Sequence, residues 1–172
     1  TAGGPIENIT LNGKKDGIRY VAIANFDLED PGVDLSKSQY IAIYGEWTKK
    51  AGFARLDPGS PQPHVLTFAD VAVDDLLKAR NADVYFYASS TYKDSPDWHA
   101  VEGDFKNPRR LTNINPQQAE FTWCAGVRLV EYTGANSEKL QGTLYLPAGY
   151  QAGKKYPTMV DIYEKLSQNT NR

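Results

Sequence analysis

An internal repeat with a period of 45 residues is the feature that most constrains how this chain can fold. Residues 40–67 align with residues 85–112 without a gap, and similar residue types meet along the alignment. The matched pairs are Tyr40 with Tyr85, Phe53 with Trp98, Asp57 with Glu102, Pro63 with Pro108, Leu66 with Leu111, and Thr67 with Thr112. A period of about 40–50 residues built from short strands is typical of the blades of a β-propeller. The alternative is a chance similarity between two hairpins of a β-sandwich.

The aromatic residues of the repeat fit the packing that propeller blades need. A four-stranded blade is apolar on both faces, so neighbouring blades must cover it. Phe53 and Trp98 recur at one position of the repeat, where large flat side chains would fill the space between blades. We therefore expect these two residues to occupy equivalent buried positions in successive blades.

The apolar runs along the chain are short and rich in β-branched and aromatic residues, which indicates strands. Runs of this kind lie at residues 20–24, 40–44, 84–87, 127–132, 140–146 and 159–163. The segment from Asp70 to Ala82 is compatible with a short helix or with a strand and its turn, and the sequence leaves both open. The predicted fold class is therefore mainly β, with partial β-propeller blades.

The repeat ends near residues 112–116, where the polar sequence Thr-Asn-Ile-Asn-Pro favours turns. We expect propeller blades over residues 1–115 and a connector over residues 116–126. Residues 127–172 would then hold the leading strands of a second, truncated domain.

The second domain begins with two runs that alternate in polarity, at residues 127–132 and 140–146. They predict an antiparallel pair with one covered face. The next run, residues 159–163, is almost continuously apolar. A strand buried on both faces of an α/β sheet has this composition.

The charge balance and hydropathy exclude some classes of partner. The 19 basic and 21 acidic residues nearly cancel, which argues against nucleic acid, because its binding requires a basic excess or patch. No stretch approaches the ~20 apolar residues that cross a bilayer, and no secretory signal opens the chain. We expect a soluble protein without a membrane segment, and periplasmic and cytoplasmic locations both stay open.

Cysteine and histidine are too scarce for a metal or thiol site. Cys124 is the only cysteine, so no internal disulfide can form. We interpret it as a small buried hydrophobe, because a nucleophile would need a base and the only histidines are His64 and His99. Two histidines without clustered cysteines make a poor zinc set, so no metal or cofactor site is predicted.

Several short motifs follow the repeat in a specific order. They are Arg-Leu-Thr-Asn (110–113), Asn-Pro (115–116), Glu-Tyr (131–132), Leu-Gln-Gly-Thr-Leu-Tyr-Leu-Pro (140–147), Lys-Tyr-Pro (155–157) and Asp-Ile-Tyr (161–163). This order resembles the junction between propeller and hydrolase domain in prolyl oligopeptidase-type serine peptidases, in particular their dipeptidyl-peptidase-like branch. The resemblance is strongest between Arg110 and Tyr163 and fainter over residues 18–109.

The resemblance implies a propeller that caps an α/β-hydrolase domain and admits short or unstructured peptides. A Ser-Asp-His triad cleaves them without metal or organic cofactor. The family serine lies in a G-x-S-x-G elbow, a pattern that this chain lacks. We therefore expect a non-catalytic fragment of a serine peptidase, inactive alone. Its expected partners are the peptide substrate and the remainder of the parent chain, and unpaired blade surfaces would promote self-association.

The resemblance also assigns a role to Tyr163. In the dipeptidyl-peptidase-like branch, the tyrosine that closes the first buried strand donates its hydroxyl to the oxyanion hole, and Tyr163 falls at that position. Such a donor must be fixed and aimed at charge that develops in the transition state. The alternative is an aromatic residue that only packs. Residues 164–166 are bulkier than the small residues and proline that often follow in the family, which predicts a differently shaped loop.

Two other functions stay open from the sequence. One is an independent propeller-like binding module, although 172 residues hold too few blades to close a ring. The other is a fragment of an esterase or acylaminoacyl peptidase with the same architecture, and exo- and endo-cleavage stay equally open. A G-x-S-x-G motif roughly 80–100 residues beyond Arg172, a spacing inferred from the family resemblance, would decide the class.

Overall fold

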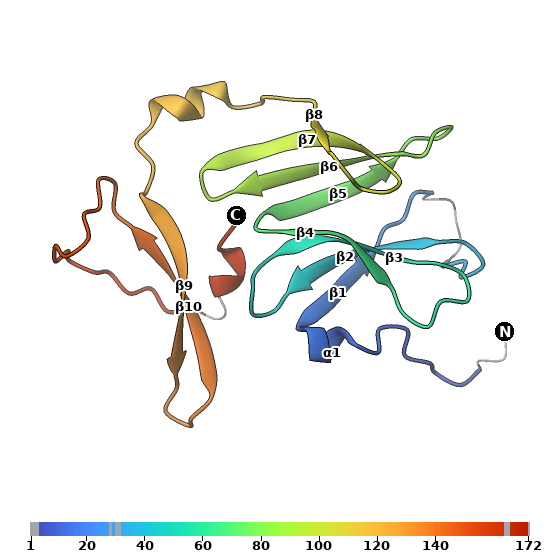
Figure 1. Cartoon of the computed structure of the whole chain (residues 1–172), viewed down its shortest axis with the longest axis horizontal. Helices are drawn as coiled ribbons and strands as arrows, with labels where there is room; N and C mark the ends of the chain where they lie inside the picture. The colour runs from blue at the N-terminus through green and yellow to red at the C-terminus, as the bar shows by residue number, and fades with distance from the viewer. Residues whose placement is uncertain (1–3, 28, 30–31, 164–165, 172) are drawn as a thin grey trace.

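The computed structural model describes residues 4–27, 29, 32–163 and 166–171. Most of its regular structure consists of short antiparallel strands (Figure 1), so the prediction of a mainly β fold is confirmed. In chain order the elements are α1 (Gly13–Asp16), β1 (Ile18–Ile23), β2 (Gln39–Gly45), β3 (Ala51–Leu56), β4 (His64–Ala69), β5 (Ala72–Lys78), β6 (Val84–Thr91), β7 (Asp94–Glu102), β8 (Arg109–Arg110), the 3₁₀ turn η1 (Pro116–Glu120), β9 (Gly126–Thr133), β10 (Lys139–Leu146) and the 3₁₀ turn η2 (Leu166–Asn169).

Two four-stranded antiparallel sheets contain most of the strands. The first sheet has the order β1-β2-β3-β4 and the second has the order β5-β6-β7-β8. Residues 40–67 supply most of β2 to β4, and residues 85–112 supply almost all of β6 to β8. The two copies of the repeat thus place their strands in the same order. Figure 1 shows the two sheets lying against each other.

Aromatic side chains fill the space between the two sheets. The buried cluster consists of Tyr40, Phe53, Leu76, Tyr85, Tyr87, Val101 and Phe105. The rings of Tyr40 and Tyr85 lie 4.8 Å apart between centroids, and the Tyr85 hydroxyl donates to the Tyr40 hydroxyl at 2.6 Å. Phe53 meets Tyr87 edge-on at 5.5 Å between centroids. Because ring pairs of this geometry add about 0.5–1.5 kcal/mol beyond simple burial, each sheet stabilises the other.

The second sheet contains a β-bulge that the matching β2–β3 pair of the first sheet lacks. Along β6, Ser89 and Thr91 are two positions apart. Their partners on β7, Asp97 and Asp94, are three positions apart. The extra residue lies beside Pro96, which has no backbone N–H for the ladder. A one-residue insertion turns the following side chains to the opposite face of the sheet.

The bulge moves Trp98 out of the position that the repeat predicts. Phe53 pairs with Ala42 in the first sheet. A shift of 45 residues takes Ala42 to Tyr87, which pairs with His99 and stacks on its ring. His99 is therefore the structural counterpart of Phe53. Phe53 is 2% exposed whereas Trp98 is only partly buried, so the prediction of equivalent buried positions is wrong by one residue.

The segment that the sequence left open between helix and strand forms β5. It pairs with β6, and the register shifts between Asp74 and Leu77. At this irregularity Asp75 has a φ of 53°, a left-handed conformation that aspartate adopts more readily than most residues. The shift lets Leu76 reach the cluster between the sheets.

The strands β9 and β10 form a separate two-stranded ribbon, which confirms the predicted antiparallel pair. One face of the ribbon contacts the β2–β3 turn. The Gln141 side-chain amide donates to the Trp47 carbonyl at 2.8 Å, and the Lys139 ammonium lies 4.9 Å from a Trp47 ring centroid. An isolated two-stranded ribbon is marginally stable in water, so these contacts anchor it to the first sheet.

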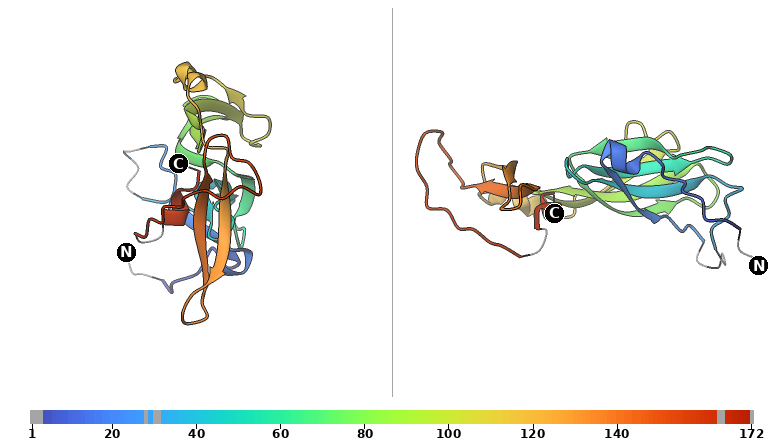
Figure 2. Two further views of the ribbon diagram at one scale, coloured as in Figure 1. Left: turned by 90° about the vertical axis from the view of Figure 1, so that its left-hand side faces the viewer. Right: turned by 90° about the horizontal axis from the view of Figure 1, so that it is seen from below.

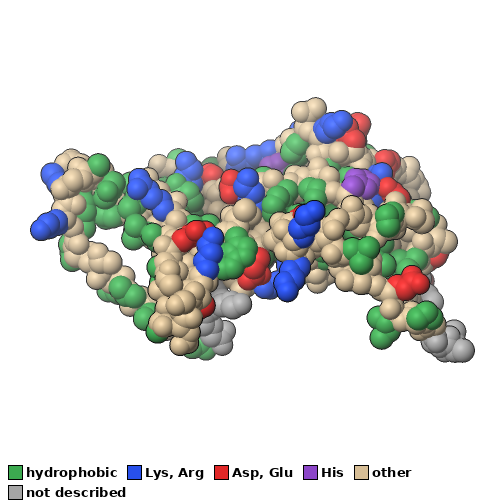
Figure 3. Space-filling model, turned by 60° about the horizontal axis from the view of Figure 1, so that its bottom comes forward, with side chains coloured by type: hydrophobic (Ala, Val, Ile, Leu, Met, Phe, Trp, Pro, Cys, Tyr) green, Lys and Arg blue, Asp and Glu red, His purple; other side chains and the backbone are tan. Residues whose placement is uncertain are grey.

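Residues 159–163 do not form the buried strand that their apolar sequence predicts. They have no strand or helix structure, and Met159 and Ile162 are 94% and 87% exposed. A strand buried on both faces needs neighbouring strands and covering helices, and the described residues contain no parallel sheet that could supply them. Figures 2 and 3 show residues 147–163 as an arm that stands away from the ribbon.

Candidate functional site

Two cavities flank the turn of the β6–β7 hairpin, residues 91–94. The first cavity, of about 340 Å³, lies between this hairpin and the connector. The second cavity, of about 470 Å³, lies between the hairpin, the β2–β3 turn and β9. Residues 91–94 line both cavities. The hairpin turn is therefore a shared wall where the two sheets, the connector and the ribbon approach one another.

The connector forms one wall of the first cavity. In η1, the Gln118 side-chain oxygen accepts a hydrogen bond from the Ser95 amide at 2.8 Å, which ties the connector to the hairpin. The Gln118 carbonyl accepts a hydrogen bond from the Trp123 indole at 2.8 Å. Trp123 is 42% exposed and lines the cavity together with Tyr92. Partly exposed aromatic rings beside a cavity offer flat surfaces for stacking.

The charges around the two cavities are mixed. The charged residues are Asp74, Lys93 and Asp94 in the first cavity, and Lys49, Asp70, Lys93 and Asp94 in the second. Lys49 is buried, and its ammonium donates to the Glu46 carbonyl at 2.6 Å. With both signs present, the cavities suit a peptide, which carries donors and acceptors along its backbone, better than a polyanion.

Tyr163, the predicted oxyanion-hole donor, lies apart from these cavities. It does not line either of them and is 69% exposed. Residues 164 and 165, on which the predicted loop shape depends, lie outside the described residues. The structure therefore does not bring Tyr163 together with a catalytic group, and its role stays a prediction.

Ser89 and His99 come closest to a nucleophile beside a base. The Ser89 hydroxyl oxygen lies 3.4 Å from His99 Nδ1, and the same nitrogen lies 3.0 Å from the Asp97 carbonyl. Because a carbonyl can only accept, Nδ1 carries the hydrogen and cannot take a proton from Ser89. A general base must present a free lone pair to the hydroxyl. The contact between Ser89 and His99 is therefore structural, and the His99 ring is held in place by stacking on Tyr87.

Ser38, Asp57 and His64 also lie together, but in the wrong order for a triad. The Ser38 hydroxyl donates to Asp57 at 2.7 Å, and His64 Nδ1 lies 3.6 Å from the other carboxylate oxygen. The hydrogen bond from Ser38, with help from Arg55, holds the pKa of Asp57 below its usual value. In a triad the serine faces the histidine, so this cluster braces the β3–β4 connection.

The remaining candidate groups give no further site within the described residues. Cys124 is a free, partly buried thiol rather than a fully buried one. No group of three or more histidine, cysteine or acidic residues in this part of the chain could hold a metal ion. Likewise, no helix among these residues has the length and apolar character needed to cross a membrane.

Sequence reasoning missed the residues that form the cavities. The turn sequence Thr-Tyr-Lys-Asp at residues 91–94 and the aromatic Phe-Thr-Trp at residues 121–123 are visible in the chain. Two aromatic residues close together in the short connector, Phe121 and Trp123, were the available signal. Their approach to the hairpin depends on Gln118, whose long-range bond no local pattern encodes.

Comparison with known proteins adds a likeness of fold. No family model and no curated protein matches the chain. Two solved structures of the AtxE2 isopeptidase match it, one a variant with Astexin3-dC4 bound (TM-score 0.57) and one in the apo form (TM-score 0.56). Each is 16% identical and covers 73% of this chain and 19% of the isopeptidase chain. This chain thus spans about a fifth of the isopeptidases whose fold it shares.

Proposed function

We propose that this chain is part of a serine peptidase of the prolyl oligopeptidase type. It would supply two neighbouring propeller blades, a connector and the first strands of an α/β-hydrolase domain, and so act as gate and scaffold. The observation that carries this proposal is the likeness of fold to part of an isopeptidase over 73% of this chain.

The stacking of the two sheets supports the propeller part of the proposal. They follow one another along the chain, have the same strand order and share an aromatic core. Successive blades of a propeller have these three properties, because each blade must bury its faces against its neighbours.

Exposed apolar surfaces support the hydrolase part. The outward face of the ribbon carries Val130, Tyr132 and Leu144, which are 46%, 54% and 38% exposed. The arm adds a second apolar stretch at residues 159–163. Apolar patches of this kind mark surfaces that another element covers. On our proposal, the remaining strands and helices of a hydrolase domain cover both, and residues 159–163 become a central strand.

The cavities at the hairpin turn support a short peptide as the ligand. Their volumes fall in the range of about 300–1,000 Å³ that is usual for ligand sites. Tyr92 and Trp123 provide apolar contact area, and the charged residues of both signs can pair with peptide groups. We assign these cavities to the path by which a short, unstructured peptide reaches the hydrolase domain.

A fluorophosphonate probe tests the reaction class. We expect the 172-residue chain to keep its intact mass after exposure to the probe, because it lacks a G-x-S-x-G elbow. A longer polypeptide from the same gene should be labelled at one serine. Stoichiometric labelling of the 172-residue chain, or a longer polypeptide without a reactive serine, would contradict the proposal.

The same longer polypeptide tests Tyr163. In α/β sheets, ligands bind at the carboxyl ends of strands, where Tyr163 would lie once residues 159–163 join a sheet. Tyr163→Phe keeps the ring and removes the hydroxyl. We expect kcat to fall about 100- to 1,000-fold with little change in KM or Tm. A near-normal kcat would leave Tyr163 as a packing residue.

A propeller-like binding module is the second candidate. Its support is that Tyr92 and the 42% exposed Trp123 both line the first cavity, since exposed aromatics serve recognition as well as catalysis. A longer polypeptide that binds peptides but reacts with no probe would favour this function over the peptidase.

A further inference from the structure

The last strand of the second sheet ends early. β8 has two residues, whereas its counterpart β4 has six. After β8, the Leu111 amide still donates to the Trp98 carbonyl at 2.8 Å. The chain then leaves the sheet as residues 111–115, here called the exit segment, and continues into the connector.

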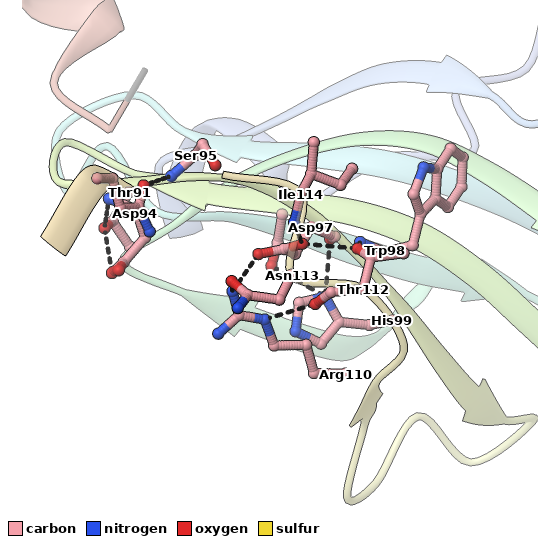
Figure 4. A network of polar contacts seen from close by, with 12 residues as sticks. Thr91, Asp94, Ser95, Asp97, Trp98, His99, Arg110, Thr112, Asn113 and Ile114 are labelled. Atoms are coloured by element: carbon pink, nitrogen blue, oxygen red, sulfur yellow. Dashed lines mark hydrogen bonds and ion pairs between the residues drawn. The ribbon is translucent and has the colours of Figure 1, made fainter. Parts of the chain in front are cut away.

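Side chains replace the backbone ladder where β8 ends. The carboxylate of Asp97 accepts hydrogen bonds from the Thr112 hydroxyl at 2.6 Å and the Ile114 amide at 2.9 Å. Its other oxygen pairs with the Arg110 guanidinium. The Thr112 hydroxyl oxygen in turn accepts from the Trp98 amide at 2.9 Å. As Figure 4 shows, one carboxylate from β7 holds the exit segment at two points.

Little apolar burial holds the exit segment and the connector. Leu111, Ile114 and Phe121 are all exposed, and no residue of η1 is buried. Burial is the main non-directional contribution to stability. A segment that lacks it depends on a few directional bonds, so the bonds to Asp97 and the Gln118–Ser95 bond decide its position.

The exit segment and the connector also form a wall of the first cavity. Asn115, Gln118 and Trp123 line it from this side, and the β6–β7 hairpin lines it from the other. If the exit segment moves away from Asp97, this wall moves with it and the cavity widens.

We propose that Asp97 is a latch that keeps the connector closed over the first cavity. When the carboxylate releases Thr112 and Ile114, the exit segment swings out and the cavity opens. That the cavity then admits a peptide rests on the proposed function, whereas the latch itself does not.

The charges around Asp97 allow the exit segment to be either bound to Asp97 or released from it. Asp97 is 3% exposed, but the Arg110 side chain is 49% exposed. Arg110 also donates to the Thr112 carbonyl at 2.9 Å and to Asn113 at 3.1 Å. Opening therefore leaves the guanidinium in contact with the exit segment or with water, and no cation is stranded inside. The nearest histidine, His99, contacts only the Asp97 backbone carbonyl in this network.

Two variants separate the latch from general stability. Asp97→Asn keeps the size but leaves one accepting oxygen for donors on two sides, so its amide N–H₂ must face either Arg110 or the Thr112 hydroxyl and the Ile114 amide. Thr112→Val removes the hydroxyl at nearly constant shape, whereas Thr112→Ser keeps it. Asp104→Asn is the matched control, since Asp104 is an exposed carboxylate in the loop between β7 and β8 that pairs with Lys106 at 3.9 Å.

Amide hydrogen exchange, followed by NMR on this chain, provides the readout. We expect Asp97→Asn and Thr112→Val to speed exchange at Ile114 and Leu111 by about tenfold or more, because local opening exposes these amides. The Trp123 indole signal should shift as the cavity wall moves. Exchange at the amides of β2 and β6 should stay unchanged in both variants. The control variants Thr112→Ser and Asp104→Asn should exchange like the wild type at all of these amides.

The exchange measurements test the latch, and peptide titration tests the proposed function. Local acceleration with an unchanged core supports the latch. Unchanged exchange at Ile114, or equal acceleration throughout both sheets, overturns it. Titration with an unstructured tripeptide is a separate arm, in which a latch that opens without any peptide binding would count against the proposed function alone.

Discussion

The two sheets share a strand order but differ in their inward-facing residues and in how their last strand ends. The first sheet pairs all four strands along their length and turns Phe53 inward toward the second sheet. The second sheet turns Trp98 outward, puts His99 in the inward position and ends on a two-residue strand. The first sheet is thus held by backbone ladder and burial, and the second ends in a polar network around Asp97.

A single inserted residue accounts for much of this difference. The bulge beside Pro96 shifts the register of β7, so the aromatic that the repeat provides lands on the outer face. The first sheet has its irregularities elsewhere, between β1 and β2 at Tyr20 and Ala22 and between β3 and β4 at Phe53 and Ala54. Repeats can therefore preserve strand order while bulges redistribute the side chains between core and surface.

Replacement of the inward Phe53 and of the outward Trp98 should give the largest difference in the free energy of unfolding. We expect Phe53→Ala to lower the free energy of unfolding by about 3–5 kcal/mol, because it empties a fully buried site between the sheets. Trp98→Ala should cost less than half as much, since that ring is partly exposed. Urea unfolding of both variants measures the difference.

Equal losses at the two positions would break the comparison, because they would mean that Trp98 is as deeply buried as Phe53. The slopes of the unfolding curves should match that of the wild type, which shows that the variants unfold from comparable native states.

The outer faces of the sheets predict a second, smaller effect. Gly52 pairs with Ile43, whose repeat equivalent Ala88 pairs with Trp98. A Cβ at Gly52 would lie 1.9 Å from the Thr67 carbonyl oxygen. The first sheet therefore excludes any side chain where the second accommodates an indole, and Gly52→Ala should cost about 1–3 kcal/mol through overpacking.

Gly142→Ala in the ribbon is the control for this substitution. A Cβ there meets its nearest atom, in the Tyr132 ring, at 3.9 Å, so the free energy of unfolding should change by less than about 0.5 kcal/mol. If Gly52→Ala is equally mild, the close approach of β4 at this point is relieved by a small backbone shift.

The hydroxyl pair between the sheets predicts a third effect. Tyr85→Phe removes the donor to the buried Tyr40 hydroxyl but keeps the ring, and should cost about 1 kcal/mol. Burial, with the Tyr40 hydroxyl, raises the pKa of Tyr85. Its contribution is therefore complete below the ordinary tyrosine pKa of 10.0 and is lost at higher pH.

Thermal unfolding of Tyr85→Phe at neutral pH and near pH ~11 checks both statements. The variant should lose less stability in alkali than the wild type. Tyr145→Phe, at a site 52% exposed in the ribbon, should match the wild type at both pH values.

Five of the six apolar runs overlap strands as predicted, because strand formation depends on local composition and short turns. The outward position of Trp98 could not be predicted, since it depends on one bulge, although Pro96, two residues before Trp98, was a local sign of irregularity. The prediction of a buried strand at residues 159–163 was wrong for another reason. Their composition indicates a buried strand, but burial requires neighbours that the described residues do not provide.

The candidate site was less accessible to sequence reasoning than the fold. Its cavities form where residues 91–94 meet residues 115–123, and Gln118 makes that contact over a sequence distance of 23 residues. The family resemblance drew attention to Arg110 and Thr112, but their common partner Asp97 lies on another strand.

The smallest expected effect is a difference in acid sensitivity between Asp97 in the second sheet and Asp57 in the first. Burial would raise the pKa of Asp97, but the hydrogen bonds from Thr112 and Ile114 and the Arg110 guanidinium outweigh it and hold the pKa below its usual 3.8. The unfolded chain then binds this proton more readily than the folded chain. The stability that Asp97 contributes is complete above pH ~4 and is lost as the pH falls further.

Asp57 has a lowered pKa for similar reasons, but its side chain is 32% exposed and water screens its partners. We therefore expect the urea midpoint of Asp97→Asn to vary less with pH between about 2 and 5 than that of the wild type. Asp57→Asn should follow the wild type closely. If Asp57→Asn instead removes more of the acid dependence, the ionised carboxylate that matters lies in the first sheet, and the polar closure of the second sheet contributes little to stability.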